Sequence, residues 1–176
     1  MAFTFTVEDG TGVAGANSYT TVAFADTYIS INSQQQPTWD ALSTQAKEHL
    51  LARATQYLDR MIQWKGEKTI EDSALRWPRA GVYDTDGILI ADDVIPRVLQ
   101  EATAEVAVYF VTQDLTRSAG GGGELEELHV DVIELHWRDS PPDEQVPSWI
   151  LALIDCLGWL KEKPGRGTRF KTIKRR

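Results

Sequence analysis

The sequence is poor in residues that build cross-links, and it has no long hydrophobic run. Cys156 is the single cysteine among 176 residues, so no disulfide bond can form within the chain. No apolar stretch approaches the roughly 20 residues that a membrane-spanning helix needs. The segment Met1 to Val7 lacks the basic group that opens a secretory signal. We therefore expect one globular domain with no membrane partner.

No complete set of catalytic residues emerges from the sequence. The glycine-rich stretch GTGVAG (Gly10–Gly15) lacks the Lys-Ser/Thr pair of a phosphate-binding loop, and we interpret it as a flexible loop. His129, Asp131 and His136 have the composition of a two-His, one-carboxylate metal triad. Polar residues on a solvated strand face explain them more simply. Cys156 lies in a segment too apolar to activate a thiol and is predicted in the core. The sequence predicts no enzyme, no cofactor and no metal.

Charge is distributed very unevenly along the chain. The formal net charge is -8 at pH 7, but the last 16 residues, Lys161 to Arg176, carry +7 and the other 160 carry -15. An acidic body repels nucleic acid. The basic tail has three readings: it contacts nucleic acid, it docks onto an acidic protein surface, or it is simply disordered. Docking onto an acidic protein surface is the interpretation that we favour.

Hydrophobic periodicity predicts a mainly α fold, a small helical bundle with a short β-hairpin or strand element and extended N- and C-terminal arms. One helix is expected after a Ser18 cap, a second after a Ser43 cap, and a third from Pro96, which fits a first helical turn. The last helix, at about 148–160, is apolar nearly all round and is expected to be buried on most sides, either by its own domain or by neighbouring subunits.

The domain boundaries follow from composition. Residues 1–163 are expected to form one domain, with an N-terminal arm at 1–17 and a strand insertion at about 124–138. The basic tail occupies 164–176.

The stretch LRWPR (Leu75–Arg79) combines a rigid Trp-Pro pair with two arginines, which can pair with carboxylates or phosphates. Trp77 is expected either to fill the core or to take part in a contact between subunits. The DTDG that follows (Asp84–Gly87) starts like a calcium loop but lacks its third acid and distant Glu. Because apolar residues flank it, we predict a hairpin turn.

Several blocks of the sequence resemble one known family. They are VEDGTGVAGANSY (Val7–Tyr19), ARATQYLDR (Ala52–Arg60), LRWPRAGVYDTDG (Leu75–Gly87) and VIPRVLQEATAEVA (Val94–Ala107). The chain resembles the head–tail connector, or head-completion adaptor, proteins of tailed bacteriophages, a group often labelled DnaT-like single-stranded-DNA-binding. The Gly120–Gly123 run and the very basic last 16 residues depart from that pattern.

The resemblance implies a structural protein of the virion neck, which resides in the host cytoplasm during assembly. Such adaptors form a homo-oligomeric ring, typically of twelve subunits, below the portal protein. The ring extends the channel for packaged double-stranded DNA, which passes without sequence-specific binding, and it presents a surface to the next neck or tail-completion protein. The tail residues implied to dock on the portal are Arg166, Arg169, Phe170, Lys171, Lys174, Arg175 and Arg176.

The stretch that opens at Leu75 is expected to lock one subunit to the next. Its candidate contact residues are Arg76, Trp77, Pro78, Arg79 and Tyr83, with Trp77 as a buried anchor. The alternative function is a replication-type module that binds single-stranded DNA, for which the basic tail would be the binding surface.

Overall fold

The computed structural model describes residues 3–112 and 146–161, and these residues form a mainly helical fold, as the sequence predicts. The Gly120–Gly123 run, the predicted strand insertion at 124–138, the triad His129, Asp131 and His136, and the tail at 164–176 lie outside the described residues. The elements, in chain order, are α1 (Val22–Ile29), α2 (Gln36–Asp40), α3 (Thr44–Met61), β1 (Ile62–Trp64), β2 (Glu67–Lys68), β3 (Arg79–Ala80), α4 (Arg97–Thr112), α5 (Ser148–Leu153) and β4 (Gly158–Leu160).

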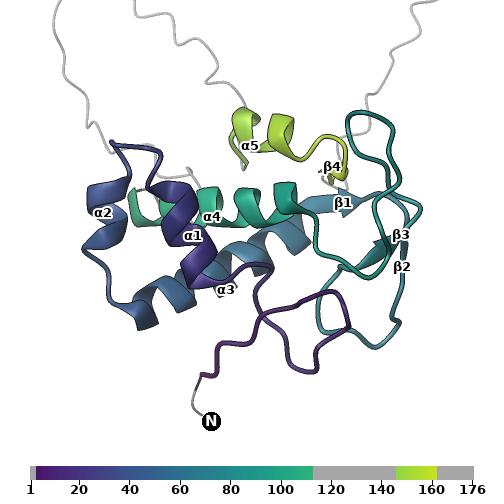
Figure 1. Ribbon diagram of the computed structural model, residues 1–176, viewed down its shortest axis with the longest axis horizontal. Coiled ribbons are helices and arrows are strands. Elements are labelled where there is room, and N and C mark those ends of the chain that lie inside the picture. The colour runs from purple at the N-terminus through teal and green to yellow at the C-terminus, as the bar shows by residue number, and fades with distance from the viewer. Residues whose placement is uncertain (1–2, 113–145, 162–176) are drawn as a thin grey trace, which may run out of the picture.

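Helices α3 and α4 form the centre of the fold. They pack against each other across the middle of the molecule, with α5 on the side of α4 away from α3 (Figure 1). Leu51 and Leu58 of α3 and Leu99 and Val106 of α4 are fully buried. Full burial of each such side chain contributes about 1.5–3 kcal/mol of hydrophobic free energy, so this pair of helices dominates the core.

Two of the three predicted helix starts agree with the structure. The Ser43 side chain accepts a hydrogen bond from the backbone N–H of Ala46, which caps α3. Pro96 precedes α4 directly, and its carbonyl accepts from the N–H groups of Leu99 and Gln100.

The start predicted at Ser18 is wrong. The hydroxyl of Thr21, not of Ser18, accepts from the backbone N–H of Phe24 and caps α1. Ser18 is buried and donates instead to the carbonyl of Thr20. The short helix α2 comes before the Ser43 cap; it starts at Gln36 and has a proline in its first turn.

The last predicted helix is shorter than the sequence suggests. Helix α5 ends at Leu153, and the chain turns into strand β4, which pairs antiparallel with β1 so that Leu160 lies opposite Ile62. A Cβ at Gly158 would lie 2.7 Å from Ile62 Cγ2, so the close approach of the two strands requires glycine there. Because a continuous apolar run has no hydrophobic period, the sequence pattern cannot distinguish helix from strand there. Pairing with β1 makes the second half of this run a strand. Trp159 is 54% exposed, so the chain's own domain does not supply the burial that was expected on most sides of this segment.

A second small sheet pairs β2 with β3, with Glu67 opposite Ala80. The turn into it needs Gly66, which has a φ of 65° and would place a Cβ 2.2 Å from the Ala80 carbonyl oxygen. The N-terminal segment is irregular but closed on itself, because Val7 bridges Ser18 and the carbonyl of Thr6 accepts from the N–H groups of Asn17 and Ser18.

Candidate functional site

The middle of the LRWPR stretch belongs to the interior of the chain. Trp77 is fully buried and meets Trp64 of β1 edge to face, with ring centroids 6.1 Å apart, and Pro78 is buried beside it. The Arg79 guanidinium donates to the carbonyls of Lys65, Gly66 and Arg76. Trp77, Pro78 and Arg79 therefore stabilise the fold of their own chain.

Of the two roles expected of Trp77, the structure shows that it fills the core. Trp77 and Pro78 offer no surface to another chain, because the core of this chain already surrounds them. Arg76 and Tyr83 are exposed on either side of the buried middle. A contact between subunits stays a prediction for those two.

Residues 81–90 form the predicted hairpin, which we call the apolar hairpin. Tyr83 and Leu89 make an antiparallel bridge, and the Asp84 carboxylate accepts from the backbone N–H groups of Asp86 and Ile88 at 2.9 and 2.8 Å. Gly87 adopts a φ of 77°, which closes the turn. The sequence therefore predicted this hairpin correctly.

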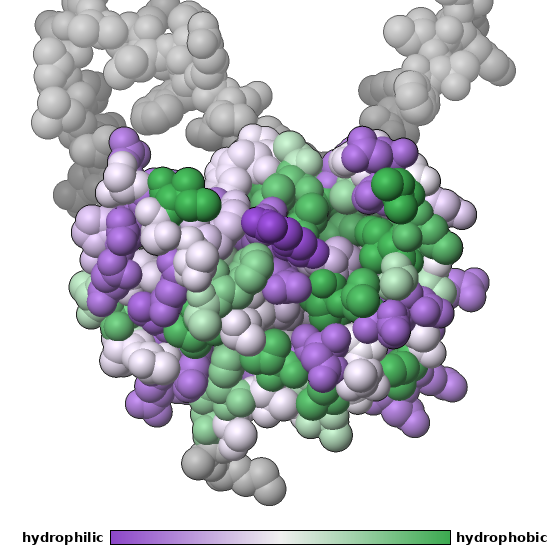
Figure 2. Space-filling model, in the orientation of Figure 1, coloured by the Kyte–Doolittle hydropathy of each residue, from purple (hydrophilic) through white to green (hydrophobic). Residues whose placement is uncertain are grey.

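The apolar hairpin places large hydrophobic side chains in solvent. Tyr83, Ile88 and Leu89 are 55%, 64% and 56% exposed. Figure 2 shows hydrophobic residues gathered on the right of this face, where Figure 1 draws β4 and the loop that follows β3. A hollow of about 440 Å³ separates the hairpin from the turn before β4, with Lys65, Tyr83 and Cys156 in its lining. Clustered exposed apolar side chains are typical of a protein-contact surface.

Cys156 is half-buried and packs against the edge of the core, so the prediction that it lies in the core is met only in part. Burial raises the pKa of its thiol, which disfavours the reactive thiolate.

A second surface feature is a hollow of about 470 Å³ at the end of α3, which we call the basic hollow. Three separate stretches bring cations to it: Arg60 from the last turn of α3, Arg76 from the loop before Trp77, and Lys161 directly after β4. The other side chains that line it include those of Gln56, Asp59 and Leu75.

Asp59 is the structural support of the basic hollow. Its Oδ1 accepts from the Tyr19 hydroxyl at 2.7 Å and from Trp64 Nε1 at 3.0 Å, and its Oδ2 accepts from the backbone N–H of Arg76. Burial raises the pKa of this carboxyl although these hydrogen bonds oppose the rise. The Tyr19 hydroxyl also accepts from the N–H groups of Arg76 and Trp77, so the loop is held at a fixed position.

Lys161 is held in place as well. Its ammonium donates to the carbonyls of Asp59 and Arg60 at 2.8 and 3.0 Å, where the end of α3 leaves carbonyl groups without helical partners. Burial lowers the pKa of Lys161, and the nearby Arg76 guanidinium lowers it further. Positive charges are therefore crowded at this end of the molecule.

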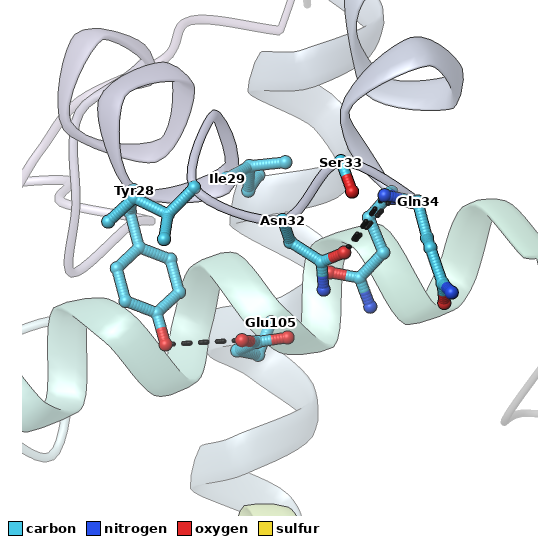
Figure 3. Close-up of a pocket in the computed structure, with 8 residues that line it drawn as sticks. Tyr28, Ile29, Asn32, Ser33, Gln34 and Glu105 are labelled. Carbon is cyan, nitrogen blue, oxygen red and sulfur yellow. Dashed lines mark hydrogen bonds between the residues drawn. The ribbon is translucent and has the colours of Figure 1, made fainter.

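A third hollow, of about 410 Å³, lies between the end of α1 and α4 (Figure 3). Tyr28 points from α1 towards α4, and its hydroxyl donates to Glu105 at 3.1 Å. Asn32 accepts from the backbone N–H of Gln34, two residues further along the same loop after α1. Burial raises the pKa of Tyr28 to about 12, with a further contribution from Glu105, and burial also raises the pKa of Glu105. The hydrogen bond between Tyr28 and Glu105 joins α1 to α4.

Within residues 3–112 and 146–161, no group of three or more His, Cys, Asp or Glu side chains is arranged to hold a metal ion. Across the same ranges, no helix is long and apolar enough to cross a membrane.

The described residues thus define a class: a mainly helical domain that carries one apolar and one basic surface feature beside a small sheet. The chain belongs to the family described as "Putative DnaT-like ssDNA binding protein", whose model matches residues 3–175. No curated protein and no solved structure matches the chain.

Sequence reasoning missed Arg60 and Trp159. In the sequence Arg60 is an ordinary residue of a helix's last turn, and the residues around it do not indicate that Arg76 and Lys161 lie close to it in the fold. The strand alternation in GWLK (Gly158–Lys161) was the one available signal for an exposed tryptophan.

Proposed function

We propose that the chain is a structural adaptor of the phage head–tail junction, located in the virion neck. It forms a ring, typically of twelve subunits, below the portal protein, extends the DNA channel and receives the next neck or tail-completion protein. No covalent chemistry is part of this role, and no cofactor is required. The resemblance of the sequence blocks to adaptor proteins is what suggests it.

The observation that carries the proposal is the apolar hairpin. Its exposed Tyr83, Ile88 and Leu89 sit on a rigid turn, which lowers the entropic cost of forming a protein contact. The described residues include 16 Asp and Glu against 9 Lys and Arg, a net charge of -7. An acidic body suits a channel wall along which DNA slides without sticking.

The test is co-sedimentation of the full chain with the portal ring of the same phage in physiological salt. The expected result is that wild type sediments with the portal or with further copies of itself. A triple variant, Tyr83→Ser, Ile88→Ser and Leu89→Ser, should lose one of these associations at unchanged stability. Ile31→Ser is the matched control, because Ile31 is 83% exposed but lies in the loop after α1.

The basic tail is tested in the same assay. Replacing Lys171, Lys174, Arg175 and Arg176 by Glu should block docking on the portal. If wild type associates neither with the portal nor with itself, the adaptor proposal is wrong.

Single-stranded DNA binding is the second candidate, and the family description favours it. Under this function the tail would provide most of the affinity, since Lys and Arg neutralise phosphates. The same four-residue Glu variant should then abolish binding to an oligonucleotide, and wild-type binding should weaken steeply as salt rises.

A further inference from the structure

The basic hollow differs from the rest of the described body in that its arginines are available. Six of the nine described cations donate to groups of their own chain, and Arg53 lies over the ring of Phe110. The six are Lys47, Lys65, Lys68, Arg79, Arg97 and Lys161. Within the part of the chain that the structure describes, the guanidinium groups of Arg60 and Arg76 have no hydrogen-bond or ion-pair partner.

The two guanidinium groups are also exposed and face one hollow. The backbone that carries them is fixed: Arg60 lies in the last turn of a packed helix, and the backbone N–H of Arg76 donates to both Tyr19 and Asp59. Lys161 adds a third positive charge, while the carboxyl of Asp59 is occupied below them by three hydrogen bonds. A group of guanidinium and ammonium donors around one hollow suits an anion with several oxygens, such as a phosphate.

An exposed tryptophan lies near Lys161 in the sequence. Trp159 of β4 is 54% exposed and precedes Lys161 by two residues, a spacing that places two side chains on the same face of extended chain. Its strand partner on that outer face is Gln63, which is exposed as well. An exposed tryptophan beside cations is the arrangement with which proteins bind single strands, where bases stack and phosphates are neutralised.

We propose that the basic hollow binds the phosphate groups of single-stranded DNA through Arg60, Arg76 and Lys161, and that Trp159 stacks on a neighbouring base. This inference deepens the DNA-binding candidate and rests on it, and it does not depend on the adaptor role. It adds a binding site on the folded body to the one expected in the tail.

The experiment measures the anisotropy of a fluorescein-labelled oligothymidylate of about 15 nucleotides, titrated with the full chain at several salt concentrations. The double variant Arg60→Gln and Arg76→Gln should lower the affinity about tenfold and reduce the slope of log K against log salt by about 1 to 2. Trp159→Ala should also lower the affinity about tenfold but leave the slope unchanged, because it removes stacking and no charge.

Arg97→Gln is the matched control, because Arg97 is an exposed arginine on α4 that already pairs with Glu101. It should leave affinity and slope within twofold of wild type. Urea unfolding of every variant shows that the fold is retained.

The outcomes distinguish two questions: whether the chain binds single-stranded DNA, and whether the basic hollow is a binding site for it. If wild type does not bind the oligonucleotide at all, the DNA-binding candidate and the hollow both fail. If wild type binds and the double variant matches Arg97→Gln, the tail alone binds DNA and the hollow is wrong. If the double variant instead loses binding to a fluorescent oligoglutamate peptide and keeps binding to DNA, the hollow recognises an acidic protein segment, which also overturns the inference.

Discussion

The apolar hairpin and the basic hollow flank the same short strand but offer opposite chemistry. The hollow lies beside Arg60, which precedes β1, and the hairpin lies beside Lys65, which follows it. The block LRWPRAGVYDTDG contributes to both: Leu75 and Arg76 line the hollow, and Tyr83 lies in the hairpin. The buried Trp77–Arg79 segment between them fixes both surfaces to one core. A dense motif can thus serve two surfaces through one anchor.

The largest effect is expected from breaking that shared anchor. Trp77→Ala should lower the free energy of unfolding by about 3–5 kcal/mol, because it removes a fully buried aromatic side chain and leaves a cavity. Urea denaturation measures the loss, and both surfaces should fail together. Trp159→Ala, which truncates an exposed ring, should stay within about 0.5 kcal/mol of wild type. Equal losses for the two tryptophans would contradict the assignment of Trp77 as the anchor.

Gly66→Ala should be next in size. The substitution forces a residue with a side chain into a left-handed backbone conformation and places its Cβ 2.2 Å from the Ala80 carbonyl oxygen. The Gly66 carbonyl also accepts a hydrogen bond from Arg79. Gly87→Ala in the hairpin has a similar positive φ but nothing within 4 Å of its Cβ, so it should cost about 1–2 kcal/mol. Thermal unfolding should place Gly66→Ala at least about 1 kcal/mol below Gly87→Ala. The reverse order would mean that the β2–β3 turn is not a tight constraint.

Tyr19→Phe should weaken the basic hollow and leave the apolar hairpin in place. The lost hydroxyl donates to Asp59 and accepts from the backbone of Arg76 and Trp77, so the expected cost is about 1–3 kcal/mol. Because Asp59 and Arg76 line the basic hollow and all three partners of this hydroxyl lie outside the hairpin at 81–90, oligonucleotide affinity should fall while association through the hairpin persists. A variant that loses hairpin association and keeps DNA affinity would contradict this division.

The smallest effect is expected far from both surfaces, at Glu105 in the third hollow. Burial raises its folded pKa above the ordinary value, so the folded protein binds this proton more tightly and wild-type stability falls as pH rises through that window. Glu105→Gln keeps an acceptor for Tyr28 and removes this dependence. Its stability relative to wild type should be higher at about pH 7 than at about pH 4, by a small amount because solvent screens the half-exposed group. Urea unfolding at the two pH values measures it, and a difference of opposite sign would refute the assigned shift.

Local rules predicted much of the fold, and long-range pairing decided the rest. The Ser43 cap, Pro96 and the Asp84–Gly87 turn act within a few residues of themselves, so the sequence revealed them. Strand β4 exists because its backbone meets β1 almost a hundred residues earlier in the chain. The basic hollow is beyond sequence reasoning for the same reason, since its three cations come from distant stretches that only the tertiary fold brings together.

The apolar hairpin and the basic hollow are tested most directly when variants of each are measured in both assays, protein association and DNA binding. The hairpin triple variant and the Arg60→Gln/Arg76→Gln variant are each measured for co-sedimentation with the portal ring and for anisotropy of the labelled oligothymidylate. If the hairpin contacts protein and the hollow binds phosphate, the hairpin variant should lose protein association and keep its affinity for DNA. The arginine variant should lose affinity for DNA and keep protein association. If either variant loses both activities, or neither loses any, the division into a protein-contact hairpin and a phosphate-binding hollow is wrong.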